Sequence, residues 1–477
     1  MKKAFTAVLL CALLILASCA GGPAEDDSVT VTETEAETET AAETKTEITT
    51  GAETEAESVT ETVTETETET ETETETETKA ETEAETVKET ETETESVTEP
   101  EPEKTAPPVI KGAIIIEPGV AMIYGKCEKG SVLTVRSELE EYEARSDGVY
   151  FAVSAALHDK GETAVSISAV SAGKAESDKA ETTLKNKRSA DNTGVAVTLG
   201  SRVIEKAVLP DQYGTNAFSE DEIKSVTDTV KYRLKKAEKA AGKPVCLVYI
   251  IVPDPLTVYN EELTEQMRKK VESPNLRMKQ AAEALSGIEG VTVIDLTETM
   301  IKNKEKGKLY YKLDSHWTEL GAFYGYQTVM KTLGLPYHTL SDYRVDYIDI
   351  DDTDMNVYSG VGTGEMYESA PFLTALFEEK TPYGANKEET ARIWDFGYRF
   401  FINQTYKTVT DEGPSALMMF DSYGFNIMPY LAESFGVCVT QPTWKYRADY
   451  SLVSEIQPDY IIEILAERNL DELLYST

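Results

Sequence analysis

Cysteines are few in this sequence, and apolar runs of membrane-spanning length are missing. Five cysteines are present, and none forms a C-x-x-C pair or a spacing typical of a metal site. Cys246 and Cys438 lie in apolar, strand-like runs, so we interpret them as small buried residues rather than disulfide partners. No run in the chain approaches the ~20 apolar residues that a membrane-spanning helix needs. The sequence therefore predicts a chain that is anchored to a membrane rather than one that spans it.

Basic residues are also in short supply, with 46 Lys and Arg against 86 Asp and Glu, for a formal net charge of −40. Residues 25–104 alone hold 30 acidic residues and four lysines, a net charge of −26. The remainder of the chain is only moderately acidic. Because no basic excess is available to neutralise phosphates, nucleic acid is not expected as a partner.

Histidine is scarce too, since the whole chain has three. His158 lies at a turn and His338 in a loop, and neither is expected to have a catalytic role. His316 follows Asp314 by two residues, and an extended segment would send both side chains to the same face. A carboxylate beside an imidazole orients and charges a general base. A structural hydrogen-bonded pair is the alternative.

The N-terminus has the pattern of an export signal. Two lysines precede an apolar run over residues 4–16, and Leu16-Ala17-Ser18-Cys19 follows. This ending resembles a bacterial lipobox, in which Cys19 is lipidated and becomes the first mature residue. Residues 1–19 are therefore predicted to be a lipoprotein signal, and the chain to be extracytoplasmic, lipid-anchored and exposed at the bacterial cell surface. An ordinary signal peptide with a chance cysteine is the alternative.

Residues 20–108 consist mainly of Thr-Glu repeats with almost no aromatic side chains. Such a segment cannot bury enough apolar surface to offset its ordering entropy, and its like charges repel. We expect a disordered linker that tethers the folded part away from the membrane, or one that serves only as a solubilising spacer.

Residues 109–186 change to short β-type runs separated by turn signals such as Glu117-Pro118-Gly119. Strands at this even spacing suggest a small antiparallel sandwich, and at class level they resemble immunoglobulin-like modules of bacterial surface proteins. The predicted strands cover residues 113–116, 121–124, 132–135, 149–153 and 163–170.

Residues 192–477 alternate between strand and helix patterns, which predicts an α/β domain with a mostly parallel sheet and helices on both faces. Residues 338–412 are less regular and could form an insertion that walls a substrate cleft. Helices are expected over residues 220–241, 261–285 and 319–333, and strands over 245–252, 291–295, 415–420, 437–439 and 459–464.

A candidate nucleophile follows the strand that ends at Phe420. Ser422 and Gly424 lie in the next four residues, and a helix-like segment begins at Phe425. A serine at a strand-to-helix turn lies at the carboxyl edge of a parallel sheet, where α/β sites form. The free N–H groups of the following helix could stabilise an oxyanion.

Together, Asp314-Ser-His-Trp-Thr318 and Phe420-Asp-Ser-Tyr-Gly424 resemble the SGNH hydrolase-like proteins with a D-x-H-W motif. That group includes the alginate O-acetylation proteins and the DHHW-type surface proteins. Flanking blocks also match, namely Tyr213-Gly214-x-Asn216, Val252-Pro253-Asp254 with Tyr259, and Arg447. The resemblance covers about residues 195–477.

This resemblance implies a flavodoxin-like, three-layer α/β fold. It also implies a triad in which Ser422 is the nucleophile, His316 the general base and Asp314 the residue that orients it. Four further residues are candidates for contact with substrate, although core packing is the commoner role for the tryptophan. They are Tyr259, Arg447, Tyr423 and Trp317.

The implied function is an O-acyl, in first place O-acetyl, transferase or an esterase that acts on cell-envelope or extracellular polysaccharide, with no cofactor. Two departures leave room for a catalytically impaired carbohydrate-binding lipoprotein of the same fold. Phe420 replaces the family's usual glycine, and Asp254-Pro255 replaces its Asn-Lys, which removes a cation near the site. A transporter's solute-binding lipoprotein is a third reading, which the long tether fits poorly. No metal is expected, because the acids at 349–354 lack the pattern of a calcium loop.

Overall fold

The structure, a computed structural model, describes residues 102–186, 194–351, 353–360, 364–379, 406–409, 413–442 and 449–475, with only the backbone at 406–409 and 442. Cys19, the Thr-Glu segment up to residue 101 and Arg447 lie outside the described residues. The predictions for them stay predictions. Across the described ranges, no helix has both the length and the apolar character that crossing a membrane requires.

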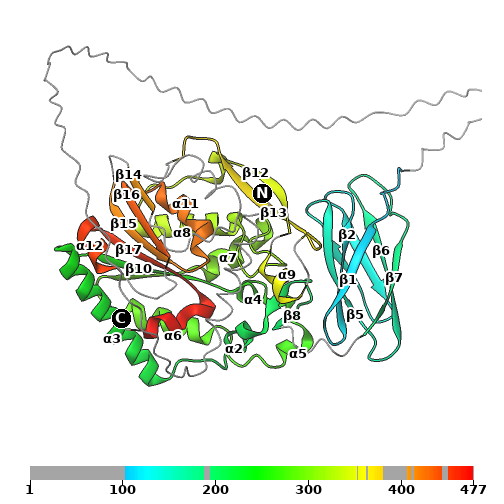
Figure 1. Ribbon diagram of the computed structural model, residues 1–477, viewed down its shortest axis with the longest axis horizontal. Helices are drawn as coiled ribbons and strands as arrows, with labels where there is room; N and C mark the ends of the chain where they lie inside the picture. The colour runs from blue at the N-terminus through cyan, green and yellow to red at the C-terminus, as the bar shows by residue number, and fades with distance from the viewer. Residues whose placement is uncertain are drawn as a thin grey trace, which may run out of the picture. The chain divides into compact units, whose positions relative to one another are not determined.

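The N-terminal part of the described chain is β-rich, as predicted (Figure 1). It contains a three-stranded sheet of order β1-β2-β5 and a four-stranded sheet of order β4-β3-β6-β7, with antiparallel pairing throughout. Ile123 and Val153 of the first sheet share a buried cluster with Val135 and Ile167 of the second. The immunoglobulin-like assignment stays a prediction. The strands are β1 (Val109–Glu117), β2 (Val120–Lys126), β3 (Val132–Ser137), β4 (Glu141–Arg145), β5 (Tyr150–Ala156), β6 (Glu162–Val170) and β7 (Ala180–Lys185).

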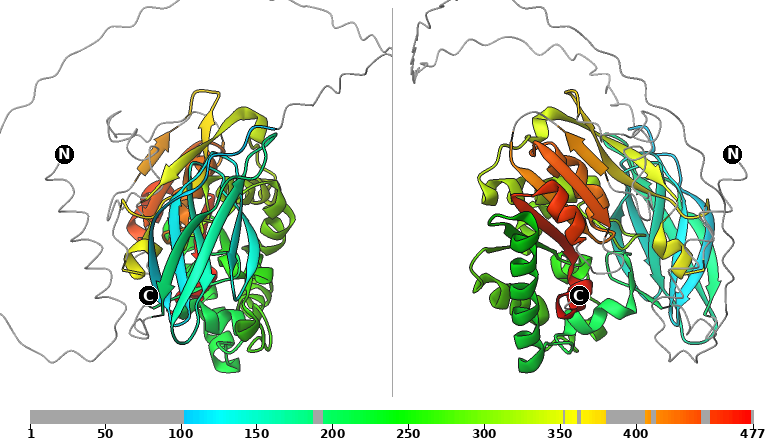
Figure 2. Two further views of the ribbon diagram at one scale, coloured as in Figure 1. Left: turned by 90° about the vertical axis from the view of Figure 1, so that its right-hand side faces the viewer. Right: turned by 60° about the vertical axis from the view of Figure 1, so that its left-hand side comes forward.

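The C-terminal part is built on a sheet of order β11-β10-β17-β15-β16-β14, in which β14 alone runs antiparallel to its neighbour. The predicted parallel sheet of an α/β domain is confirmed. Figure 2 shows helices on both sides of this sheet. The strands are β10 (Cys246–Val252), β11 (Val291–Asp295), β14 (Tyr406–Val409), β15 (Ser415–Phe420), β16 (Val437–Pro442) and β17 (Tyr460–Ala466).

Alternating side chains of the central strands enter two separate cores. Ala416, Met418 and Phe420 of β15 pack on the side of the sheet that α7, α8 and α11 cover. Leu417 and Met419 pack on the side that α3, α6 and α12 cover. Because both faces are buried, β10 and β15 are apolar along nearly their whole length. The helices are α3 (Glu220–Ala241), α6 (Leu276–Ser286), α7 (Thr297–Asn303), α8 (Glu319–Leu333), α11 (Gly424–Ala432) and α12 (Tyr450–Ile456).

Local signals fixed the ends of two helices correctly. Ser219 and Glu222 form a capping box at the start of α3, which ends before Gly242 in the left-handed conformation at φ 70°. Thr318 caps α8 by accepting a hydrogen bond from the N–H of Gly321.

The predicted helix over residues 261–285 is wrong. The chain forms two short helical turns there, and α6 begins only at Leu276. Thr264 caps a new turn, Pro274 has no N–H to donate, and Asn275 adopts a left-handed φ of 59°. Residues 338–375, by contrast, are more regular than predicted. The strands β12 (Tyr343–Ile350) and β13 (Glu368–Ala375) form an antiparallel ribbon there.

The remaining elements are short, apart from the two strands of this ribbon. They are β8 (Val195–Val197), β9 (Val203–Glu205), α2 (Leu209–Tyr213), α4 (Pro255–Val258), α5 (Glu265–Arg268), β12 (Tyr343–Ile350), α9 (Asp354–Tyr358), β13 (Glu368–Ala375), and 3-10 turns at Lys206–Val208, Asn260–Glu262, Lys304–Lys306, Leu340–Asp342 and Glu467–Leu474.

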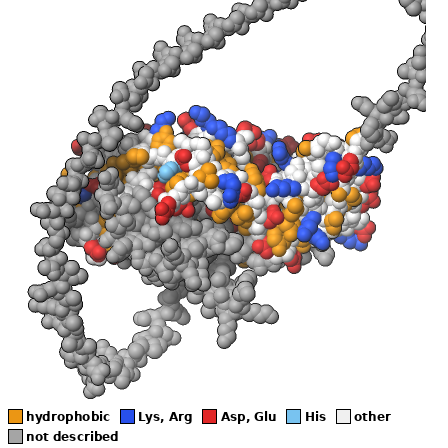
Figure 3. Space-filling view, turned by 90° about the horizontal axis from the view of Figure 1, so that it is seen from above, with side chains coloured by type: hydrophobic (Ala, Val, Ile, Leu, Met, Phe, Trp, Pro, Cys, Tyr) orange, Lys and Arg blue, Asp and Glu red, His pale blue; other side chains and the backbone are white. Residues whose placement is uncertain are grey.

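Apolar contacts also join the N-terminal sheet to the α/β part. Ile116 and Met122 of the β1-β2 ladder lie in one buried cluster with Leu313 and Met355. On the face drawn in Figure 3, acidic and basic side chains are interspersed over the described residues, with hydrophobic side chains between them.

A partly buried carboxyl on α8 makes the stability of the fold depend on pH. Glu319 accepts a hydrogen bond from the N–H of Leu373 at 2.7 Å, and burial raises the pKa of Glu319 to about 8. The unfolded chain releases this proton near pH 4.5 and the folded chain only near pH 8. The contribution of Glu319 to the free energy of unfolding is therefore greatest below pH 4.5 and falls as the pH rises to 8.

Glu319→Gln keeps the acceptor oxygen and removes the titration. We expect the variant to be more stable than the parent at pH 8.5, by a few kcal/mol in order of magnitude, and the difference to shrink towards pH 5. Urea unfolding followed by tryptophan fluorescence at both pH values measures this, with the exposed Glu298→Gln as control. Equal stability gains at the two pH values would contradict a buried, titrating Glu319.

Candidate active site

The candidate nucleophile lies where sheet and helix meet, as predicted. β15 ends at Phe420, and α11 begins at Gly424. Between them, Asp421 accepts from the N–H of Tyr423 with Oδ1 at 2.9 Å, and from the N–H of Ala466 with Oδ2 at 2.7 Å. The Asp421 carboxylate thus ties the turn that carries Ser422 to the end of the neighbouring strand β17.

Phe420 fits this turn because residue 424 is a glycine. The Phe420 side chain is buried and packs edge-on against Phe425, with ring centres 5.4 Å apart. A Cβ atom at Gly424 would lie 2.2 Å from the Cβ of Phe420, well inside van der Waals contact. The bulk that replaces the family's glycine at 420 is therefore accommodated by the missing side chain four residues later.

Asp314 and His316 meet through a turn, so the expected extended geometry is wrong. Residues 312–316 bend, while Tyr310 and Trp317 form an isolated antiparallel bridge at the base of the loop. Asp314 Oδ1 accepts from the N–H of His316 at 2.9 Å, which closes an Asx-type turn. The same oxygen lies 2.8 Å from Nδ1 of the imidazole. The short loop therefore aligns carboxylate and ring without a strand.

Two charged residues from other elements fix the backbone of this loop. Buried Arg202 donates from Nη1 to the carbonyl of Tyr311. Glu368, on β13, accepts from the N–H of Lys312 at 2.9 Å and from the N–H of Leu313 at 2.7 Å. The loop is thus fixed by hydrogen bonds on both of its sides.

The structure brings the three predicted catalytic residues together. His316 Nε2 lies 2.7 Å from Ser422 Oγ, and His316 Nδ1 lies 2.8 Å from Asp314 Oδ1. Burial lowers the pKa of His316 to about 4, an effect that the Asp354 carboxylate partly offsets. At neutral pH the ring is therefore uncharged. With a proton on Nδ1 facing Asp314, its Nε2 lone pair is directed at the serine hydroxyl.

Trp317 and Tyr423 have no exposed surface, which contradicts the prediction that they contact substrate. The indole of Trp317 donates to the carbonyl of Tyr423 at 2.9 Å, and the Tyr423 hydroxyl donates to the carbonyl of Ser315. Both side chains are core residues that fasten the Asp314-x-His316 loop to the serine turn.

Tyr259 packs against the base of the loop that carries Asp314 and His316. Its ring packs edge-on against Tyr310 with centres 6.2 Å apart, and the Arg202 guanidinium carbon lies 4.5 Å from its ring centre. Its hydroxyl accepts a long hydrogen bond, 3.4 Å, from the N–H of Leu309. These contacts fit a residue that supports the loop, and direct contact with substrate stays a prediction.

Residues 218–345 match the family model described as SGNH hydrolase-like domain, acetyltransferase AlgX. The resemblance to the SGNH hydrolase-like proteins is confirmed. The matched residues include Asp314 and His316, whereas Ser422 lies beyond them. No protein with a curated description matches the chain.

Solved structures that are similar to this chain include a DHHW family protein from Eubacterium siraeum, with 15% identity and a TM-score of 0.41 over 52% of this chain and 86% of that one. PatB1 from Bacillus cereus shares 16% identity at a TM-score of 0.42 over 55% and 95% of the two chains. The O-acetyltransferase domain of Pseudomonas putida AlgJ shares 14% identity at a TM-score of 0.37 over 60% and 94%.

A cation lies near the SGNH-like site even though the lysine of the strand-end block is missing. Arg468, two residues past β17, donates to Asp254 Oδ1 at 3.2 Å and to Ser315 Oγ at 2.9 Å. Its guanidinium carbon lies 5.1 Å from the ring centre of Tyr423. The strand-end block lacks its lysine, but the 3-10 turn Glu467–Leu474 supplies a cation near the same place, and Asp254 is its counter-ion.

Sequence reasoning also missed Asp354, one of the acids at 349–354 that it considered only as possible metal ligands. Asp354 begins α9, and its carboxylate accepts from the N–H of Ser315 at 2.9 Å and from the Ser315 hydroxyl. Its own N–H donates to Asp314 Oδ2 at 3.0 Å. The contacts span about forty positions of sequence, and no local pattern announces them.

Asp314, His316 and Asp354 together form the one group in the described ranges with side chains placed to hold a metal ion. The oxygens of both carboxylates already accept N–H hydrogen bonds, and His316 Nδ1 faces Asp314. A cation would have to displace these bonds. The two carboxylates are therefore better placed to orient the imidazole than to bind a metal ion.

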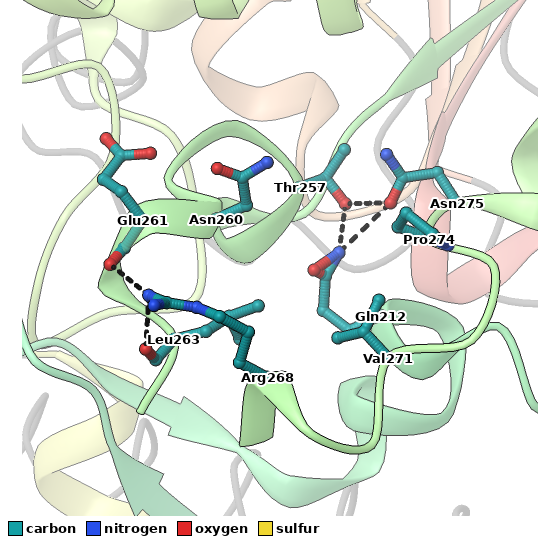
Figure 4. Close-up of a pocket in the computed structure, with 9 residues that line it drawn as sticks. All are labelled: Gln212, Thr257, Asn260, Glu261, Leu263, Arg268, Val271, Pro274 and Asn275. Carbon is teal, nitrogen blue, oxygen red and sulfur yellow. Dashed lines mark hydrogen bonds between the residues drawn. The ribbon is translucent and has the colours of Figure 1, made fainter. Parts of the chain in front are cut away.

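A hollow of about 410 Å³ lies beside α4 (Figure 4). Gln212 donates from Nε2 to Thr257 Oγ1 at 2.8 Å and to Asn275 Oδ1 at 3.1 Å along one side of it. Thr257 donates in turn to the buried Glu467, the neighbour of Arg468 in sequence. The residues that line the hollow all lie within 212–275, so none of the three predicted catalytic side chains lines it.

Gly424→Ala tests how the serine turn tolerates Phe420. The added methyl group would clash with the Cβ and the ring of Phe420. We expect the free energy of unfolding to fall by about 1–3 kcal/mol. We also expect kcat for ester hydrolysis to fall, because the same turn carries Ser422. Chemical unfolding and kcat on a nitrophenyl ester measure the two effects. Gly287→Ala is the matched control, because its nearest atom would be 3.9 Å away. Unchanged stability and turnover in Gly424→Ala would contradict the tight packing.

Proposed function

We propose that the chain is a serine-dependent O-acyltransferase or esterase that handles acetyl groups on cell-envelope or extracellular polysaccharide. Ser422 is the nucleophile, His316 the general base and Asp314 the residue that orients the base. A lipid on Cys19 holds the protein at the bacterial cell surface, and the Thr-Glu segment gives it reach.

The observation that carries the proposal is the line of hydrogen bonds from Asp314 through His316 to Ser422, 2.8 Å and 2.7 Å long. His316 Nε2 takes the hydroxyl proton while Ser422 Oγ bonds to the acyl carbon. The imidazolium then gives the proton to the departing alkoxide, which leaves an acyl-serine. In the second half, His316 takes a proton from a sugar hydroxyl or from water, and that oxygen bonds to the acyl carbon. The bond from the acyl carbon to Ser422 Oγ then breaks, and His316 returns the proton to Oγ.

An oxyanion needs donors beside Ser422. The N–H groups of Tyr423, Gly424 and Phe425 already bond to Asp421 or Ser422 within the turn, so the helix end offers fewer free donors than expected. Among the described residues no acceptor faces the N–H of Ser422 itself. This N–H is our candidate for the first oxyanion donor.

Different observations support the two parts of the proposed reaction, the acetyl group and the polysaccharide. The acyl class follows the matched family model, whose description names an acetyltransferase. The polysaccharide follows the resemblance to the alginate O-acetylation proteins. The surface location follows the export signal, the lipobox-like ending and the tether, which lie outside the described residues except for residues 102–108 of the tether.

Alanine at Ser422 or His316 should abolish turnover. We expect each variant of the full chain to lose at least ~10³-fold in kcat on p-nitrophenyl acetate, because nucleophile and base act as one unit. Ser286→Ala and His158→Ala, both remote from the site, serve as controls. An oligosaccharide acceptor with mass spectrometric detection of added acetyl groups separates transferase from esterase. Equal residual rates in the parent and both variants would leave the carbohydrate-binding lipoprotein as the better description.

The acid limb of the pH profile reports the state of His316. Protonation of Nε2 blocks proton transfer from Ser422, so activity is lost as the pH falls through the pKa of His316, about 4. We expect kcat/KM to stay level from pH 7 down to about pH 5 and to halve near pH 4. Released nitrophenol is read after each sample is quenched into alkali. An acid limb centred near pH 6.5 would show that His316 is not desolvated in solution.

A further inference from the structure

Asp354 contacts all three residues of the Asp314-Ser315-His316 segment from a separate helix. Its carboxylate receives the N–H of Ser315 at 2.9 Å and the Ser315 hydroxyl, and its backbone N–H donates to Asp314 Oδ2 at 3.0 Å. Its Oδ2 lies 3.7 Å from Nδ1 of His316. Its side chain is 23% exposed, and its contacts on residues 314–316 add to those that Arg202 and Glu368 make with residues 311–313.

These contacts decide which way Asp314 points. Asp314 Oδ1 is used by the N–H and Nδ1 of His316, while Oδ2 is held by the N–H of Asp354. The Asp354 side chain keeps this backbone N–H in place through its two hydrogen bonds to Ser315. If those bonds were lost and the start of α9 moved, the Asp314 carboxylate could rotate about its last bond and release the imidazole. A base that loses its orienting partner samples the wrong tautomer, and the ring nitrogen that faces Ser422 then carries a proton.

The charges around the imidazole fit this division of roles. Asp314 and Asp354 face it from one side, Arg468 bonds to Ser315 Oγ, and Ser315 Oγ lies 3.3 Å from Nδ1. Burial and the nearby Asp314 carboxylate raise the pKa of Asp354 to about 8. At neutral pH Asp354 is thus mostly protonated, and Asp314 carries the larger share of the negative charge of this carboxylate pair.

We propose that Asp354 is a positioning residue of the triad, which holds the Asp314 carboxylate and the Ser315 backbone so that His316 keeps its proton on Nδ1 and presents Nε2 to Ser422. The inference rests on the proposed function for its kinetic consequence. Its structural claim, that Asp354 sets the tautomer of His316, stands independently of turnover.

Two substitutions separate side-chain hydrogen bonding from mere bulk. Asp354→Asn is isosteric with the protonated acid, and its amide oxygen can still accept from Ser315 while its backbone N–H still donates to Asp314. Asp354→Ala removes the side-chain contacts to Ser315 and opens the loop to water. Asp346→Ala is the matched control, because Asp346 is a half-exposed carboxylate on the nearby strand β12.

The decisive readout is the ¹⁵N spectrum of the full chain labelled at histidine, which holds only three. We expect the parent and Asp354→Asn to show His316 as one tautomer with the proton on Nδ1 at pH 7. Asp354→Ala should show averaged tautomers, while His158 and His338 stay unmoved as internal references. Thermal melting checks that each variant is folded.

Kinetics give the second readout. Asp354→Ala should lower kcat by ~10–100-fold with KM unchanged within about twofold, the scale of a misaligned catalytic group, whereas Asp354→Asn should stay within about threefold of the parent. His316 signals in Asp354→Ala that match the parent would overturn the inference, even if the triad itself is active. A parent without turnover would instead defeat the proposed function, and the tautomer result would still decide the role of Asp354. If Asp354→Asn loses as much as Asp354→Ala in both readouts, neutral hydrogen bonding is not the role and the inference also fails.

Discussion

One pair of buried aromatic side chains keeps the two halves of the candidate site in register. Trp317 follows the imidazole and reaches the carbonyl of Tyr423, while Tyr423 follows the serine and reaches the carbonyl of Ser315. Each hydrogen bond is worth only about 0.5–1.5 kcal/mol to folding, yet an unpaired buried donor would cost more than that. The separation of His316 and Ser422 is therefore set by side chains that never meet a substrate. This explains why the residues that directly follow His316 and Ser422 are large and aromatic.

The parts that sequence could predict are those whose physical cause is local. Alternation along β15, the capping box of α3 and the strand-to-helix position of Ser422 all follow from neighbouring residues. Asp354 and Arg468 follow from none, because each reaches Ser315 across a gap in sequence that only the tertiary fold closes. The same limit applies to Phe420, whose fit depends on Gly424. The break in the predicted helix over residues 261–285 has a local cause in Pro274. The apolar periodicity of the segment nevertheless predicted one continuous helix.

Buried acids gather beneath the site and are a cost to the fold. Burial raises the pKa of both Asp254 and Glu467 above their ordinary values. Among the described residues, Asp254 Oδ2 and Glu467 Oε1 are buried without a hydrogen-bond partner. Arg468 offsets part of this charge through Asp254. Such arrangements are unfavourable for stability and are retained mainly where a site needs them, which agrees with the place of Arg468 beside Ser315.

The cluster that joins Ile116 and Met122 to Leu313 and Met355 has a consequence for how this protein can change. Leu313 precedes Asp314, and Met355 follows Asp354, so the apolar cover of both acids includes side chains from the first two strands of the N-terminal sheet. If evolution exchanged the N-terminal sheet for that of another protein, a sheet of the same size and strand order would not be enough. The buried side chains of the sheet would have to change together with the loop that they cover.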